Sequence, residues 1–336
     1  MAQAIESVLA QTFGDFEVIV VDNDDTDDTS KIVSRFDDSR LQHCRTGGLS
    51  MVENWEIGRK RCRGKYLTVL EDKMSYYPWS MEKLYLLIKT KRADVVVWGT
   101  GMHDQRLSAE IDVLKITTML SARSLVEDYV KGKKNWQKLP RLINSCISAE
   151  LVNQISKYYE NHTFFNYASP DLVAAFAQLA LTDNVFLIST NLIYRRSLVG
   201  NASSARVKKQ QAATYFTGNS GYDINNAVSK VPIKNYQLIH NTVYNDFLCT
   251  QERFGGKLLG CKMNDYVYAR VCMRDIFRTL FKGGKISTEI RDVSSFMRSS
   301  LSLPERVKLW FWWARLVSRK YIALRIYRHR KKNLSS

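Results

Sequence analysis

Apolar runs alternate with helical patterns along the first hundred residues of the chain. Residues 16–21 (Phe-Glu-Val-Ile-Val-Val), 66–70 (Tyr-Leu-Thr-Val-Leu) and 94–98 (Asp-Val-Val-Val-Trp) are rich in β-branched residues. Such runs are typical of strands buried on both faces of a parallel sheet. Helical spacing separates them, most clearly at 26–36 and 51–61. The pattern predicts an α/β fold, a Rossmann-like, mostly parallel sheet flanked by helices.

The pattern weakens after about residue 105. Ser169-Pro170-Asp171 precedes an apolar stretch and predicts a helix start, with Ser169 as the N-cap and Pro170 at the first helical position. Residues 185–188 indicate a strand, and 200–211 a polar, basic loop. From residue 228 onward the sequence predicts mostly helix.

Acidic clusters follow two of the predicted strands. Asp22-Asn23-Asp24 comes directly after the first, and Glu71-Asp72 directly after the second. In doubly wound sheets, ligands bind beyond the carboxyl ends of the strands. We therefore expect both clusters to face one ligand site.

The charge of the chain is concentrated at its C-terminal end. The formal net charge is +17, and residues 253–336 hold 20 Lys and Arg against 5 Asp and Glu. A basic region of this kind favours an anionic partner surface. No nucleic-acid recognition motif accompanies it, so we expect no nucleic-acid partner.

Residues 306–332 mix aromatic and basic side chains. Five apolar residues follow a spacing of three to four: Trp310, Trp313, Val317, Tyr321 and Leu324. Three basic residues lie on another side: Lys308, Arg315 and Arg319. This arrangement favours an amphipathic helix in peripheral contact with a membrane. The alternative is a last helix packed on the domain with its basic face in solvent.

Three segments together resemble the family 2 glycosyltransferases of the GT-A fold. They are Ala-Ile-Glu-Ser-Val-Leu-Ala-Gln-Thr-Phe at 4–13 with 16–23, Leu49-Ser50-Met51 with Asn54-Trp55-Glu56 and Gly64-Lys65-Tyr66, and Ser169-Pro170-Asp171. The resemblance implies a nucleotide-sugar-binding half at 1–105, an acceptor-side half at 106–227 and a helical, basic C-terminal region at 228–336.

The resemblance implies a set of donor-binding residues: Asp22, Asn23, Asp24, Asn54, Glu71, Asp72 and Lys73. Asp22 matches the acid that accepts a hydrogen bond from a ring N–H of the donor's base. The alternative is that the acidic run at 22–28 only caps the next helix.

The family's metal-binding D-x-D motif is altered here. Glu71-Asp72-Lys73 occupies its place, so Lys73 stands where the metal ligand would be. Asp72 remains as the candidate ligand of a divalent cation, Mg²⁺ or Mn²⁺. An ammonium cannot bind a cation but can pair with the donor's diphosphate directly. The alternative is a degenerate site with little or no activity.

Asp171 is the candidate catalytic base. Inverting transfer needs a carboxylate within hydrogen-bond reach of the acceptor hydroxyl. At the second position of a helix the macrodipole favours the ionised form that a base requires. The alternative is that Asp171 only stabilises the helix end.

The chain begins inside the helix that follows the family's first strand. That strand is central in such sheets, so its absence separates its two neighbours. Three explanations are a misplaced start codon, a truncated gene, or a rearranged sheet in which the strands at Val18 and Leu67 pair directly.

The sequence thus predicts a glycosyltransferase that moves a sugar from a nucleotide diphosphate donor to a glycan or lipid-linked acceptor in polysaccharide biosynthesis, with inversion. We expect it in the cytoplasm, at the inner face of the cell membrane. The alternative is a truncated or degenerate glycosyltransferase-like protein without catalytic activity.

Overall fold

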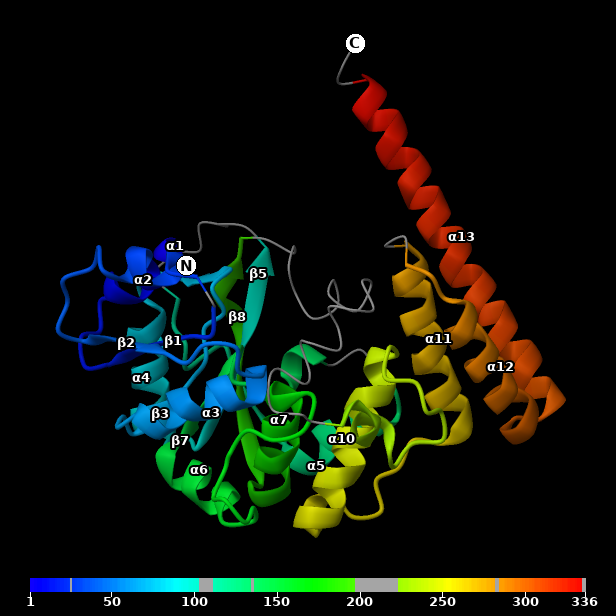
Figure 1. Ribbon diagram of the computed structural model, residues 1–336, viewed down its shortest axis with the longest axis horizontal. Coiled ribbons are helices and arrows are strands. Elements are labelled where there is room, and N and C mark those ends of the chain that lie inside the picture. Colours follow the sequence, from blue (N-terminus) through cyan, green and yellow to red (C-terminus); the bar gives the residue numbers. More distant parts are fainter. Residues whose placement is uncertain (25, 103–110, 134–135, 197–222, 282–283, 334–336) are drawn as a thin grey trace.

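The structure is a computed structural model that describes residues 1–24, 26–102, 111–133, 136–196, 223–281 and 284–333 (Figure 1). Side chains are described for these residues except Met102, Trp136 and 319–333. The loop predicted at 200–211 lies outside the described residues.

The described residues form an α/β structure. The strands are β1 (Val18–Asp22), β2 (Leu41–Arg45), β3 (Tyr66–Leu67), β4 (Met74–Tyr76), β5 (Val95–Met102), β6 (Thr117–Ser121), β7 (Ser145–Ser148) and β8 (Asn184–Arg195). The α-helices are α1 (Ala2–Leu9), α2 (Asp28–Val33), α3 (Met51–Arg61), α4 (Ser80–Lys91), α5 (Ala122–Val130), α6 (Ala149–Ser156), α7 (Pro170–Leu181), α10 (Ile239–Phe254), α11 (Asp265–Phe281), α12 (Ser287–Ser300) and α13 (Leu303–Asn333). Short 3-10 turns lie at η1 (Trp136–Lys138), η2 (Ile224–Val228) and η3 (Gly256–Leu258).

Most strands pair in one mixed sheet. Its order is β3-β7-β5-β8-β4, and β6 also pairs with β8. Only β5 and β8 run parallel in this sheet; β3, β4, β6 and β7 pair antiparallel with their neighbours. The prediction of a mostly parallel sheet was therefore wrong in strand direction. The expected α/β architecture, a sheet flanked by helices, is confirmed.

The error has a physical reason. A buried run of β-branched residues looks the same in either direction, and the strands that reverse direction are short. β4, β6 and β7 have 3, 5 and 4 residues and carry no strong apolar run.

The two faces of β5 bury different helices. Val95 and Val97 lie in the larger apolar core, together with residues of α5, α6, α7, α10 and α11. Val96 and Trp98 lie in a second core with residues of α1, α4 and β4. All four are fully buried. This alternation with a period of two is what a central strand requires, so β5 is the centre of the fold.

β5 and β8 approach closely where their register shifts, after Trp98 and after Gly99. A Cβ atom on Gly99 would lie 2.3 Å from Oδ1 of Asn191 and 3.1 Å from the carbonyl oxygen of Thr190, so a larger residue there would force these neighbours to shift. Beyond this point β8 continues to Arg195, which is one of the charged residues at the candidate site.

β1 and β2 form a separate, parallel two-stranded sheet. β3 pairs with β7 in the mixed sheet. Direct pairing of the strands at Val18 and Leu67 was one of our three explanations for the chain start, and it is wrong for the described strands.

The C-terminal region is helical, as predicted. α11, α12 and α13 lie together at one end of the molecule, and α13 extends well past the other elements toward the C-terminus (Figure 1). Its first half is held in place by Leu309, which is fully buried with Ala269 and Leu301. The division of the chain at 1–105, 106–227 and 228–336 stays a prediction. The larger core includes one residue from each of these segments: Val95, Phe176 and Tyr268.

Candidate functional site

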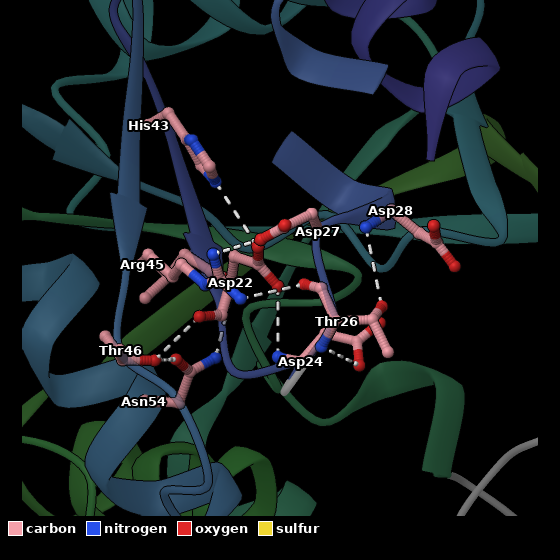
Figure 2. Close-up of polar contacts among 10 residues, drawn as sticks. Asp22, Asp24, Thr26, Asp27, Asp28, His43, Arg45, Thr46 and Asn54 are labelled. Carbon is pink, nitrogen blue, oxygen red and sulfur yellow. Dashed lines mark hydrogen bonds and ion pairs between the residues drawn. The ribbon is translucent and has the colours of Figure 1, made fainter. Parts of the chain in front are cut away.

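Asp22 lies at the end of β1, where the chain turns into the acidic loop (Figure 2). Its side chain is almost fully buried, with 2% exposed. Oδ1 accepts a 3.0 Å hydrogen bond from the backbone N–H of Asp24, and Oδ2 lies 3.4 Å from Nε2 of His43 on β2. The carboxylate therefore stabilises its own loop and faces a histidine.

The alternative interpretation was that the acidic run at 22–28 only caps the next helix. Asp27 is the N-cap residue of α2, but its side chain makes no capping hydrogen bond. It pairs instead with Arg45 of β2, which also donates a hydrogen bond to the carbonyl of Thr26 at 3.1 Å (Figure 2). The acidic loop is thus held against β2 by a basic side chain.

Asn54 joins Asp22 through a short chain of hydrogen bonds. The hydroxyl of Thr46 donates to Oδ1 of Asn54 at 2.6 Å and lies 3.0 Å from the carbonyl of Asp22 (Figure 2). Asn54 sits on α3, which begins with a capping box formed by Ser50 and Glu53. Asn23 lies beside this group and donates to the carbonyl of Leu49 at 3.2 Å.

Glu71 and Asp171 belong to one cluster of four charged side chains. Nη2 of Arg195 donates to Oε2 of Glu71 at 2.9 Å, and Nη1 of Arg141 lies 3.8 Å from Oδ2 of Asp171. The two pairs are coupled, because the charge of Glu71 acts on the pKa of both Arg141 and Asp171. The structure thus brings together a residue after β3 and the candidate base at the start of α7.

Burial and charge act in opposite directions on Asp171. Desolvation is the largest influence and raises the pKa of its carboxyl group, while the neighbouring Arg141 lowers that pKa. Burial also lowers the pKa of Arg141, and Asp171 opposes that effect. About a fifth of each side chain stays exposed, so a ligand can reach them.

The start of α7 is built differently from the sequence prediction. Ser169 is the N-cap residue and Pro170 follows it, as predicted, but the Ser169 side chain makes no capping hydrogen bond. The buried carboxylate of Asp246 on α10 lies at this helix end and accepts a hydrogen bond from the backbone N–H of Ser169 at 2.8 Å. A negative charge there is favoured by the helix dipole.

α3 links the two groups of site residues. Beside Asn54 on this helix, Glu56 accepts hydrogen bonds from the backbone N–H groups of Phe164 and Phe165 at 3.0 and 3.1 Å. Trp55 packs edge-on against the ring of Phe165, with 5.2 Å between ring centroids. The segment leading to Asp171 is therefore anchored on the helix that carries Asn54.

Asp72 and Lys73 lie at the edge of this region. Asp72 is about half exposed, and Nζ of Lys73 lies 3.7 Å from its Oδ1. Within the described part of the chain, no three acidic, histidine or cysteine side chains gather to hold a metal ion. Asp72 is paired with Lys73, and Glu71 is paired with Arg195, so in this arrangement the two carboxylates do not fit a divalent cation. The metal requirement of the reaction stays a prediction.

The cationic half of the charge cluster and the two buried carboxylates that anchor it, Glu56 and Asp246, were not predicted from the sequence. Arg195 is the last residue of β8, as Asp22 is of β1, so the same signal at a strand end could have found it. Glu56 lies inside a quoted motif. Arg141 and Asp246 had no sequence signal, because their roles depend on loop and helix packing.

A separate hollow of about 620 Å³ is lined by none of the predicted site residues. Its lining includes Arg123, Asp183 and Lys257.

Residues 1–149 match the model of Glycosyl transferase family 2. Over this part, the chain is similar to the family 2 glycosyltransferases.

Similar proteins carry the same description. An uncharacterized glycosyltransferase of Rickettsia prowazekii is 34% identical over 109 residues, which are 32% of this chain and 34% of that protein. Glycosyltransferase GlyG of Streptococcus pneumoniae is 28% identical over 110 residues, 31% of this chain and 36% of GlyG. The chain thus spans about a third of the length of these relatives.

A solved structure of S. aureus TarS in complex with UDP-GlcNAc is also similar. It is 14% identical, with a TM-score of 0.49 over 88% of this chain and 87% of that one. Separately, none of the helices searched within the described residues combines the length and apolar character needed to cross a bilayer.

Proposed function

We propose that this chain transfers a sugar from a nucleotide diphosphate donor to a hydroxyl of a glycan or lipid-linked acceptor, with inversion at the anomeric carbon. The observation that carries the proposal is the cluster in which Glu71, after β3, and Asp171, at the start of α7, are coupled through Arg195 and Arg141. It supports one site that receives both substrates.

Each site residue has a role in this proposal. Asp22, Asn23, Asp24 and Asn54 bind the nucleoside, and Glu71, Asp72 and Lys73 lie along the diphosphate. Asp171 takes the proton of the acceptor hydroxyl as that oxygen attacks the anomeric carbon. The bond to the diphosphate oxygen breaks, and the nucleoside diphosphate leaves with the bonding electrons.

Binding of the nucleoside requires Asp22 to become accessible. In the described structure its carboxylate is almost fully buried, and both its oxygens face groups of the protein. This burial favours a second candidate function, a glycosyltransferase-like protein without catalysis. Binding and turnover have to be measured separately for that reason.

We place the protein at the inner face of the cell membrane, in polysaccharide biosynthesis, with α13 in peripheral contact with lipid. The exposed apolar residues of α13 support this contact: Leu303, Val307, Trp310 and Phe311. They differ from the predicted stripe, because Trp313 and Val317 are only partly exposed. The side chains of Tyr321, Leu324 and Arg319 lie outside the described residues.

A thermal-shift screen against a panel of nucleotide sugars tests the proposed function. A ligand that binds the native state increases the free energy of unfolding, by about 2.7 kcal/mol at a hundredfold excess over its Kd, and therefore raises the melting temperature. We expect one nucleotide sugar to raise it and the matching free sugar not to. Release of nucleoside diphosphate with an acceptor then measures turnover. A shift without turnover contradicts transfer and supports the second candidate, and no shift with any nucleotide sugar contradicts transfer as well.

A further inference from the structure

Arg141 lies on a tightly folded loop, residues 139–145, that carries a strained residue. Leu142 has a φ of +64°, a conformation that residues other than glycine rarely adopt. Its N–H donates to Oγ of Ser145 at 2.7 Å, and its carbonyl accepts from Oγ1 of Thr68 at 3.0 Å. Strain of this kind costs on the order of 1–3 kcal/mol and persists where surrounding contacts impose it, often at functional sites.

The loop is anchored on both sides. The amide of Asn144 donates to the carbonyls of Gln137 and Leu139 at 2.9 and 3.3 Å. Thr68 belongs to the segment that leads from β3 to Glu71. The loop that carries Arg141 is therefore fixed to the same segment as Glu71, and several contacts of the loop set the backbone position of Arg141.

The guanidinium of Arg141 lacks hydrogen bonds that a purely structural arginine would make. Its Nε is buried and has no hydrogen-bond partner among the described residues. Its Nη1 lies 3.8 Å from Asp171, which is too long for a hydrogen bond and excludes the paired, fork-like contact that arginine makes with a structural carboxylate. A buried donor without a partner costs about 1–3 kcal/mol. Packing alone does not explain why this loop places a guanidinium here.

We propose that Arg141 is a positioning residue for the transfer reaction: its guanidinium, fixed by the 139–145 loop, holds the Asp171 carboxylate as the anion that takes the acceptor's proton. The inference rests on the proposed function. Because the contact is loose, the oxygens of Asp171 remain able to accept a hydrogen bond from the acceptor hydroxyl.

The charged groups that act on Asp171 come from three elements. Burial of Asp171 on α7 raises its pKa most, Arg141 on the 139–145 loop lowers it, and Glu71 after β3 raises it. Arg195 on β8 acts on Arg141 and pairs with Glu71. Removal of Arg141 leaves burial and Glu71 opposed only by the backbone hydrogen bonds from Leu172 and Asp171 itself. The pKa of Asp171 then rises further, and the base becomes protonated at a higher pH.

The test compares Arg141→Met with Arg141→Lys in the full chain. With the nucleotide sugar found in the thermal-shift screen, kcat/KM is measured between about pH 5 and 9. We expect the acidic midpoint to move up by about one pH unit in Arg141→Met, the lower end of what an opposite charge at this distance produces. Arg141→Lys restores most of the profile because it keeps the charge. Arg123→Met, which removes an exposed arginine, serves as the control.

A titration followed by ¹³C NMR provides a readout that needs no activity. The Asp171 carboxyl signal is assigned by its loss in Asp171→Asn, and its midpoint is expected to be higher in Arg141→Met than in the wild type. If Arg141→Met does not fold, Arg141→Gln takes its place. If the wild type is active and Arg141→Met has the same midpoints as the wild type by both methods, the inference about Arg141 is overturned and the proposed function is not affected. A wild type that neither binds nor turns over nucleotide sugars overturns the proposed function and the reaction role of Arg141 with it.

Discussion

The buried carboxylate of Asp246 accepts a 2.8 Å hydrogen bond from the backbone N–H of Ser169, two residues before Asp171. The contact joins α10 to the first turn of α7, which carries the candidate base. Because Ser169 makes no capping bond with its own side chain, the position of Asp171 depends on a residue far away in the sequence.

We expect Asp246→Asn to lower both the stability and the transfer rate. The change keeps the shape of the side chain but removes its charge, so a charge-assisted bond to a buried N–H is weakened. The free energy of unfolding should fall by about 1–3 kcal/mol, measured by urea denaturation. kcat should fall more than donor affinity, because the residues proposed to bind the nucleoside lie at the end of β1, in the loop after it and on α3. Asp183→Asn is the control, since that side chain is 84% exposed; wild-type stability and kcat in Asp246→Asn would contradict the prediction.

Asp171→Asn should abolish transfer and leave donor binding largely intact. The amide keeps the size of the side chain but cannot take a proton, so only the chemical step is lost. Product formation and the thermal shift with the donor are measured on the same preparation. Asp265→Asn is a matched control, because Asp265 is also an acid in the first turn of a helix, α11. Transfer by Asp171→Asn at a near-normal rate would refute the assignment as base.

Local signals in the sequence predicted local structure well. α3 was predicted at 51–61 and is found at Met51–Arg61, because a capping box starts it and apolar spacing continues it. The strands at 16–21 and 94–98 correspond to β1 and β5. These elements depend on their own residues, so the pattern of the chain is enough to find them.

Contacts between segments that are far apart in the chain could not be predicted from the sequence. The stretch at 66–70 reads as a strong strand, yet β3 has only two residues, which pair with Ile147 and Ser148 of β7. The role of Glu56 depends on the loop at 164–165, and that of Arg141 on a strained turn. The carboxylates at the site were found as residue types at strand and helix ends. Of their cationic neighbours, Arg195 ends a strand as Asp22 does and could have been found, whereas no spacing in the sequence relates Arg141 to Asp171.

Metal removal tests the role of Lys73. Because Lys73 brings a positive charge to the place of a metal ligand, we expect turnover in EDTA to stay within about threefold of that with Mg²⁺ or Mn²⁺, a difference of under 1 kcal/mol. Lys73→Ala should weaken donor binding, since the charge opposite the diphosphate is lost. Lys31→Ala, on the exposed surface of α2, is the control. Full dependence of turnover on a divalent cation would contradict the direct pairing of Lys73 with the diphosphate.

The exposed apolar residues of α13 make a sharper membrane test than removal of the whole tail. Deleting 306–336 would also remove Leu309, which is fully buried, and so would disturb folding. Trp310 and Phe311 are 60% and 58% exposed, so changing both to Glu leaves the core intact. Each change removes an aromatic side chain from the lipid interface and adds a negative charge near anionic headgroups.

We therefore expect the double variant Trp310→Glu, Phe311→Glu to bind anionic phosphatidylglycerol vesicles at least about tenfold more weakly than the wild type, a loss of about 1.4 kcal/mol. Vesicle sedimentation measures the binding, and circular dichroism checks that the helix content is unchanged. Met119→Glu is the matched control, because Met119 is equally exposed, at 59%, but lies on β6. If the double variant and the control sediment with vesicles to the same extent as the wild type, α13 does not contact the membrane, and its apolar face has another partner.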